Sequence, residues 1–236
     1  KVSSLSLLLK SKPFIEHFKW EDCSTIFHII CKKTGHKKCS INAPSFFMFH
    51  QINAFEKKDK IYFDGVTFKD SSVIDALYLK NLRSKDLCLP QGVFTRFELN
   101  LTQQTCKTIK KLHHLPIEMP QINYTYFNAK DYNFVYGLSS NKSQFFDRII
   151  KLNTTTEKTL FYYVDGCIPS EPVFVQKPNS KDEDSGMLLS ILLNTKDNKT
   201  ELHGIDAKTM KMRFKSCVDG LSAFSFHGQF FSSNKI

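Results

Sequence analysis

The chain has 236 residues, a length that suits one large domain with a substantial core or two small domains. Its composition, 41% hydrophobic and 24% charged, is ordinary for a soluble globular protein, and its longest apolar runs fall well short of the roughly 18 residues of a transmembrane helix. The net charge is +10, but the lysines are scattered and no zinc finger, basic helix or RNP-like motif is present. We therefore expect no nucleic-acid partner. A diffusely basic surface and attraction to anionic lipid headgroups are the two remaining interpretations.

Cysteine usage and the N-terminal residues bear on the compartment. The seven cysteines are an odd number and none forms a C-x-x-C pair, which favours reduced thiols in a cytosolic protein over a disulfide framework. The first residues include no initiator Met and no signal-peptide pattern. We therefore expect the sequence to begin within a longer protein.

Helical patterns are scarce in the chain. Residues 3–11 form one short candidate, and residues 70–83 form a better one, with an Asp/Ser start followed by apolar residues at helical spacing.

Short strands separated by turns are the dominant pattern. Residues 92–101 alternate, with Val93, Phe97 and Leu99 on one face and Arg96 and Glu98 on the other. Other segments are also of strand length, rich in β-branched or aromatic residues and bounded by turn residues. They are 60–68, 132–138, 159–166, 171–178 and 186–194.

A recurring strand–turn–strand pattern helps to distinguish between the possible all-β architectures. An apolar strand, a polar turn and a second strand recur at 27–38, 147–163 and 202–215. Many short strands are compatible with a sandwich, a barrel or a propeller, and such recurrence favours the blades of a β-propeller. No linker divides the chain, so we expect one domain over residues 1–236.

Four polar residues stand in otherwise apolar or proline-rich segments: His50, Glu118, Glu171 and His227. They are 68, 53 and 56 residues apart, close to the length of one blade with its loops. Because the innermost strand of each blade faces the propeller axis, one such residue per blade would converge on one axial point. Phe-rich stretches at 46–49 and 224–231 flank both histidines and suit either a tunnel wall or the propeller core.

Two interpretations of these four residues are open from the pattern alone. In one, the imidazoles of His50 and His227 bind a transition metal, and carboxylates accept the other ring N–H and fix its orientation. In the other, each residue has an unrelated structural role, such as a core histidine bonded to backbone. Glu118 and Glu171 need a partner in either case, because an unpaired buried carboxylate is costly.

Several long segments closely resemble signature segments of the carotenoid cleavage oxygenases, most of all the animal β-carotene oxygenases and their retinoid isomerase relative. The segments occur in the same order as in that family. They are "APSFFMFHQINAFE" (43–56), "EMPQINYTYFNAKDYNFVYGL" (118–138), "PSEPVFVQKPNSKDEDSGMLLSILLN" (169–194), and "LHGIDAKTMKMRF" (202–214) with "FSFHGQFF" (224–231).

The resemblance implies an all-β fold, a seven-bladed β-propeller with short helices in a cap, of which this chain covers the C-terminal blades. It implies an axial non-haem Fe(II) held by four histidines with three glutamates behind them. His50 and His227 match the third and fourth ligands, and Glu118 and Glu171 match glutamates that bond the ligand imidazoles. The implied reaction is oxidative cleavage of a carotenoid or apocarotenoid double bond by O₂ to give two carbonyl products. The implied location is cytoplasmic or mitochondrial, with peripheral membrane contact as a further possibility.

The chain also departs from the family pattern. The positions of the first two histidine ligands and of one glutamate precede Lys1, and His17, His28 and His36 do not replace them. We expect no ligand role for these three, nor for the remaining histidines at 113, 114 and 203. Two alternatives to an oxygenase remain open: a retinoid isomerohydrolase of the same fold, and a catalytically incomplete fragment that only binds a lipid or carotenoid.

Overall fold

Antiparallel sheets of consecutive strands dominate the structure, a computed structural model that describes residues 13–141, 145–220 and 227–232. In the first large sheet each strand pairs with the next along the chain, as in a propeller blade. Its strands are β3 (Phe47–Lys57), β4 (Lys60–Phe68), β5 (Val93–Asn100) and β6 (Thr105–Pro116).

The next two sheets repeat this meander. The second has the order β7-β8-β9-β10, and the third has the order β11-β13-β14-β15, with β12 also pairing with β13. The strands of the second sheet are β7 (Glu118–Gln121), β8 (Phe134–Ser139), β9 (Arg148–Asn153) and β10 (Thr159–Tyr163). Those of the third are β11 (Cys167–Pro169), β12 (Val173–Gln176), β13 (Gly186–Asn194), β14 (Lys199–Asp206) and β15 (Met212–Asp219).

A separate two-stranded hairpin precedes these sheets. Strands β1 (Thr25–Ile30) and β2 (Lys37–Ala43) pair only with each other among the described strands. The hairpin buries Ile41 against Phe97 and Leu99 of β5, so it packs on the outer part of the first large sheet.

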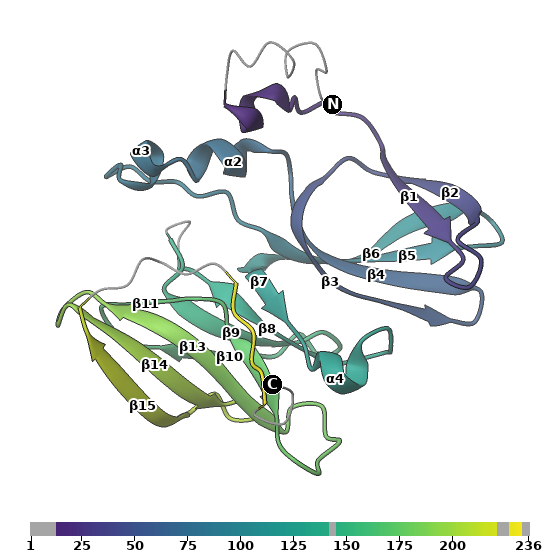
Figure 1. Cartoon of the computed structure of the whole chain (residues 1–236). Helices are drawn as coiled ribbons and strands as arrows, with labels where there is room; N and C mark the ends of the chain where they lie inside the picture. The colour runs from purple at the N-terminus through teal and green to yellow at the C-terminus, as the bar shows by residue number, and fades with distance from the viewer. Residues whose placement is uncertain (1–12, 142–144, 221–226, 233–236) are drawn as a thin grey trace.

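The described helices are all short. Figure 1 shows α2 and α3 above the β7–β10 sheet, and α4 below and to the right of β7. The segment 227–232, drawn in yellow, passes close to the residues after β11, because the Gly228 N–H donates to Glu171. The bounds are η1 (Phe14–His17), α2 (Ser72–Ala76), α3 (Leu79–Leu82) and α4 (Tyr124–Phe127). No helix of the described residues is long and apolar enough to span a membrane.

The core lies between neighbouring sheets. One buried cluster joins Phe94 of β5 to Val135 and Ile150 of the second sheet, and another joins Leu138 of β8 to Leu188 of β13. Each such side chain contributes about 1.5–3 kcal/mol when it is fully buried. The sheets are therefore held face to face by apolar packing, and their inner strands are brought close together.

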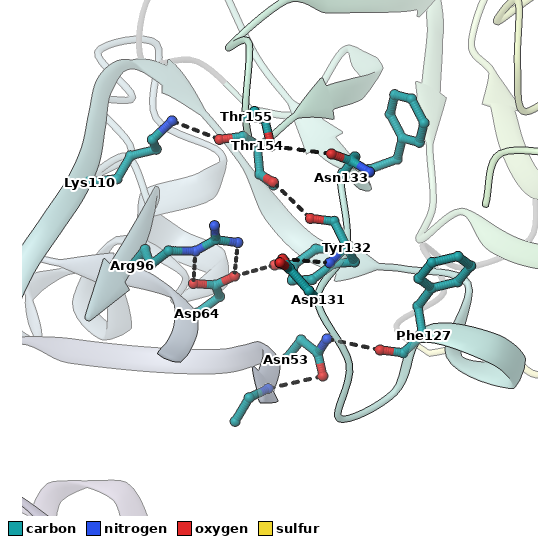
Figure 2. Close-up of polar contacts among 12 residues, drawn as sticks. Asn53, Asp64, Arg96, Lys110, Phe127, Asp131, Tyr132, Asn133, Thr154 and Thr155 are labelled. Atoms are coloured by element: carbon teal, nitrogen blue, oxygen red, sulfur yellow. Dashed lines mark hydrogen bonds and ion pairs between the residues drawn. The ribbon is translucent and has the colours of Figure 1, made fainter. Parts of the chain in front are cut away.

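A buried polar seam also joins the first two large sheets (Figure 2). Arg96 on β5 donates from Nε and Nη2 to Asp64 on β4, at 2.8 and 2.7 Å. Tyr132, which precedes β8, donates its hydroxyl to the same carboxylate at 2.5 Å. Burial lowers the pKa of Arg96, but the hydrogen bonds and charge of Asp64 outweigh this and hold it above its usual value. The seam fixes how the second sheet sits against the first.

Most of the expected strands are observed, and two have the predicted bounds, 60–68 and 186–194. The helix expected over 70–83 is broken into α2 and α3, because the backbone of Tyr78 is extended (φ −61°, ψ 136°). The twelve-residue strand β6 was not predicted, since its side chains are mostly exposed and its lysines mask any alternation. The helix expected at 3–11 lies outside the described residues.

Candidate metal centre

His50 lies on β3 where the strand departs from regular pairing. The register between β3 and β4 shifts between Met48 and Gln51 and again between Gln51 and Asn53. Such bulges bend a strand and re-aim a side chain, and they are common beside active sites. The imidazole of His50 is directed away from the sheet to which it belongs and toward β7 of the next sheet, where its partner lies.

Glu118, the first residue of β7, holds His50. The Nδ1–H of His50 donates to Glu118 Oε2 at 2.5 Å, and the Met119 backbone N–H donates to the same oxygen at 2.6 Å. Burial lowers the pKa of His50, but the hydrogen bond and charge of Glu118 outweigh it, so the pKa of His50 is raised above 6.5. A carboxylate can only accept, so Nδ1 carries the proton and Nε2 is the nitrogen with a lone pair for a metal.

Glu171 and His227 form a second pair of the same kind. His227 Nδ1 lies 3.1 Å from Glu171 Oε2, and the Gly228 N–H donates to that oxygen at 3.0 Å. Glu171 follows β11 and is buried, with only 6% of its side chain exposed, whereas His227 is 55% exposed. The carboxylate again engages Nδ1, which assigns Nε2 to any metal.

The two pairs meet at one point. The ring centroids of His50 and His227 are 5.3 Å apart, and the ring planes are nearly perpendicular, at 80°. The four residues come from β3, β7, the connection after β11 and the segment 227–232, so the blade-like spacing indicated their convergence correctly. That they bind a metal remains a prediction.

The residues present fit one half of a four-histidine metal site. Two imidazoles with Nδ1 on a carboxylate are the usual arrangement of metal-binding histidines. Glu118 Oε1 is buried and has no hydrogen-bond partner in the described part of the chain. An uncompensated carboxylate oxygen is costly, and a cation on His50 would offset its charge. Among the described residues no group of three or more His, Cys, Asp or Glu side chains is arranged for a metal, so His50 and His227 supply only two ligands.

The other described histidines make different contacts or lie on other elements. His28 on β1 lies 2.9 Å from Ser40 Oγ, and His203 is buried on β14 between the Tyr162 hydroxyl and Glu201. His17 is buried in η1, His36 lies in the turn before β2, and His113 and His114 are exposed on β6.

A mainly apolar cavity of about 190 Å³ opens beside the first pair. His50, Glu118 and Met119 form one part of its wall, and Val73 and Leu77 of α2 and its C-cap form another. The Phe stretch at 46–49 was expected to form either a tunnel wall or the propeller core, and it does both. Phe49 lines the cavity, whereas Phe46 stacks on Phe97 in the core, with ring centroids 5.0 Å apart. In the second Phe stretch, 224–226 lie outside the described residues, and Phe230 and Phe231 are exposed.

Sequence reasoning missed one polar residue at this site, Gln121. Its Nε2 donates to Glu171 Oε1 at 2.9 Å. The sequence did contain a signal for Gln121, because this residue lies only three residues after Glu118 in a segment that resembles the family. In a regular strand, however, residues i and i+3 point to opposite faces, so the pattern did not suggest it.

A family model described as retinal pigment epithelial membrane protein matches residues 2–232. The chain belongs to this family, the carotenoid cleavage oxygenases. It is 29% identical to the β,β-carotene 15,15′-dioxygenase of Gallus gallus over 98% of its own length and 51% of the relative's. It is also 29% identical to a mitochondrial carotenoid-cleaving dioxygenase of Pongo abelii over 94% of this chain and 47% of that protein. The chain thus spans about half the length of these relatives.

Solved structures show the same fold. The cobalt-substituted apocarotenoid oxygenase of Synechocystis matches with a TM-score of 0.88 at 20% identity, over 99% of this chain and 49% of that structure. Together with the meandering sheets and short helices, this likeness confirms the all-β propeller fold expected for a carotenoid cleavage oxygenase.

Replacing either glutamate with glutamine tests its role in holding an imidazole. Glu118→Gln and Glu171→Gln keep the side-chain shape but remove the charge that orients the ring, so each is expected to weaken Co(II) binding by about 10–100-fold. Isothermal titration of the protein with Co(II) measures this. If both variants bound Co(II) with wild-type affinity, the glutamates would not be needed to orient the imidazoles for the metal.

The raised pKa of His50 predicts how metal binding depends on pH. A metal takes the neutral imidazole, so protonation of His50 alone lowers the affinity by about tenfold for each pH unit below its raised pKa. Because Glu118 raises that pKa, Glu118→Gln should shift the fall to lower pH. Co(II) titrations from pH 5.5 to 8.5 test this, and an unshifted profile in Glu118→Gln would contradict it.

Proposed function

We propose that this chain is the C-terminal part of a single β-propeller oxygenase that uses Fe(II) and O₂ to cleave a polyene double bond of a carotenoid or apocarotenoid. The products would be two carbonyl compounds. The observation that carries the proposal is the pair of imidazoles, 5.3 Å apart, each with Nδ1 on a buried carboxylate. The names of the relatives and the cobalt held by the Synechocystis enzyme support it.

The roles of this chain's residues follow from their contacts. His50 and His227 would hold the iron through Nε2, and Glu118 and Glu171 orient their rings. When bound, the iron supplies the open coordination position at which O₂ is activated. The cavity beside His50 is lined by apolar and aromatic residues such as Phe49 and Phe68, which exclude water and accept a hydrocarbon chain.

Access to a lipid substrate is part of the proposal. Leu77, Tyr78 and Leu79 are exposed at 36%, 36% and 59% around the junction of α2 and α3, and Leu77 also lines the cavity. Exposed apolar side chains at a cavity entrance suit peripheral contact with a membrane that holds the polyene. We place the protein in the cytoplasm, and the mitochondrial relatives support the mitochondrion as the alternative.

The test is an assay of the full-length protein with β-carotene and an apocarotenal under ¹⁸O₂. Aldehyde products that carry ¹⁸O, formed only when O₂ is present, are expected. Turnover of a retinyl ester to an isomerised retinol, equally fast under argon, would overturn the proposal in favour of the isomerohydrolase. Tight carotenoid binding without turnover would overturn it in favour of a lipid binder.

A further inference from the structure

Gln121 is aimed at the axial site by a local irregularity in β7. Met119 has a φ of 47°, in the left-handed region, and the pairing of β7 with β8 shifts between Glu118 and Gln121. A bulge of this kind removes the strict alternation of a strand. Glu118 can therefore reach back to His50 of the preceding sheet, while Gln121, on the same short strand, reaches forward to Glu171 of the following one.

The contacts of Glu171 divide between its two oxygens. Oε2 lies 3.1 Å from His227 Nδ1 and accepts the Gly228 N–H, whereas Oε1 accepts the amide of Gln121 at 2.9 Å. A buried carboxylate held through one oxygen can rotate about its terminal torsion, since that torsion is broad. A donor on the other oxygen fixes its plane. The Gln121 amide is that donor.

The two imidazoles differ in how their carboxylates are held. Glu118 Oε2 and Glu171 Oε2 each accept a backbone N–H, from Met119 and Gly228. Glu118 Oε1 has no hydrogen-bond partner in the described part of the chain. Glu171 lies in a connection between β11 and β12, and its second oxygen depends on a side chain from another sheet. Its histidine is also the more exposed of the two, at 55% against 22% for His50. Both oxygens of the carboxylate beside His227 therefore have donors, and one of these donors is the Gln121 amide.

We propose that Gln121 is a positioning residue that fixes the plane of the Glu171 carboxylate and so holds His227 in the tautomer with Nε2 directed at the metal. The proposal deepens the proposed function, because it takes His227 as a metal ligand. One strand, β7, then aligns both halves of the site, through a side chain at each end.

Gln121→Met removes the amide at nearly constant volume, and Gln103→Met makes the same change in an exposed turn. The first readout is long-range ¹H–¹⁵N NMR of the metal-free chain, which reports which ring nitrogen of His227 carries the proton. Wild type and Gln103→Met should show a protonated Nδ1, and Gln121→Met a mixture of tautomers for His227 with His50 unchanged. The second readout is Co(II) affinity, which should fall by about tenfold or more in Gln121→Met alone.

The proposal is overturned if Gln121→Met leaves the His227 tautomer unchanged and its Co(II) affinity within twofold of wild type. Gln121→Glu provides a second variant of the same shape, in which a carboxylate faces Glu171, and the same loss of the His227 tautomer is expected. A changed tautomer in a chain that never binds Co(II) would uphold the positioning contact and refute the metal site, so the two failures are distinguishable.

Discussion

Replacing His50 or His227 with alanine is expected to lower the affinity for Co(II) by more than about 100-fold, a larger loss than removal of a supporting glutamate produces. Each substitution removes one of only two imidazoles that this part of the chain brings together, with ring centroids 5.3 Å apart. One histidine alone cannot chelate. Isothermal titration of the protein, with cobalt visible spectra as a check on nitrogen ligation, measures the loss.

His28→Ala is the matched control for this experiment. His28 also lies on a strand and also engages a polar side chain, the Ser40 hydroxyl at 2.9 Å, but it lies on the β1–β2 hairpin and not in the axial site. Its affinity for Co(II) should equal that of wild type. Equal losses in all three variants would show that metal binds the histidines non-specifically and would contradict the site.

Asp64→Asn is expected to destabilise the fold by about 3–5 kcal/mol, the usual cost of leaving one partner of a buried ion pair uncompensated. Asp64 is fully buried, the Arg96 side chain is only 13% exposed, and the substitution leaves the guanidinium beside a neutral amide. The Tyr132 hydroxyl also loses its charged acceptor. Urea unfolding followed by circular dichroism measures the change in the free energy of unfolding.

Lys57→Gln provides the comparison for Asp64→Asn. It removes the nearby ion pair with Asp131, in which the two side chains are 63% and 59% exposed. An exposed pair of this kind contributes little, so a change below about 0.5 kcal/mol is expected. If Asp64→Asn were as mild as this control, the seam between the first two large sheets would not hold them together.

The fold was largely predictable because its strands carry strong local patterns. Residues 60–68 are rich in β-branched and aromatic side chains, and residues 186–194 are a leucine-rich apolar run; turn residues flank both, and the structure has the same bounds. The missed strand β6 is an exposed outer strand that buries few side chains, so no apolar alternation marks it. The break at Tyr78 arises from its extended backbone conformation, which the helical spacing of apolar residues does not indicate.

The site was predictable only in part. Regular spacing indicated that His50, Glu118, Glu171 and His227 converge, because blade length controls which residues reach the axis. Spacing does not determine which carboxylate holds which imidazole. It also could not reveal Gln121, because that residue points to the site only through the bulge at Met119, which breaks the two-residue period of a strand.

The position of a bound metal ion is the most direct test of the proposed metal site. Crystals of the protein grown with Co(II) and measured at the cobalt absorption edge give that position by anomalous scattering. One peak about 2.1 Å from Nε2 of both His50 and His227 is expected. A peak on Nδ1 of either ring, or at other histidines with none between these two, would contradict it.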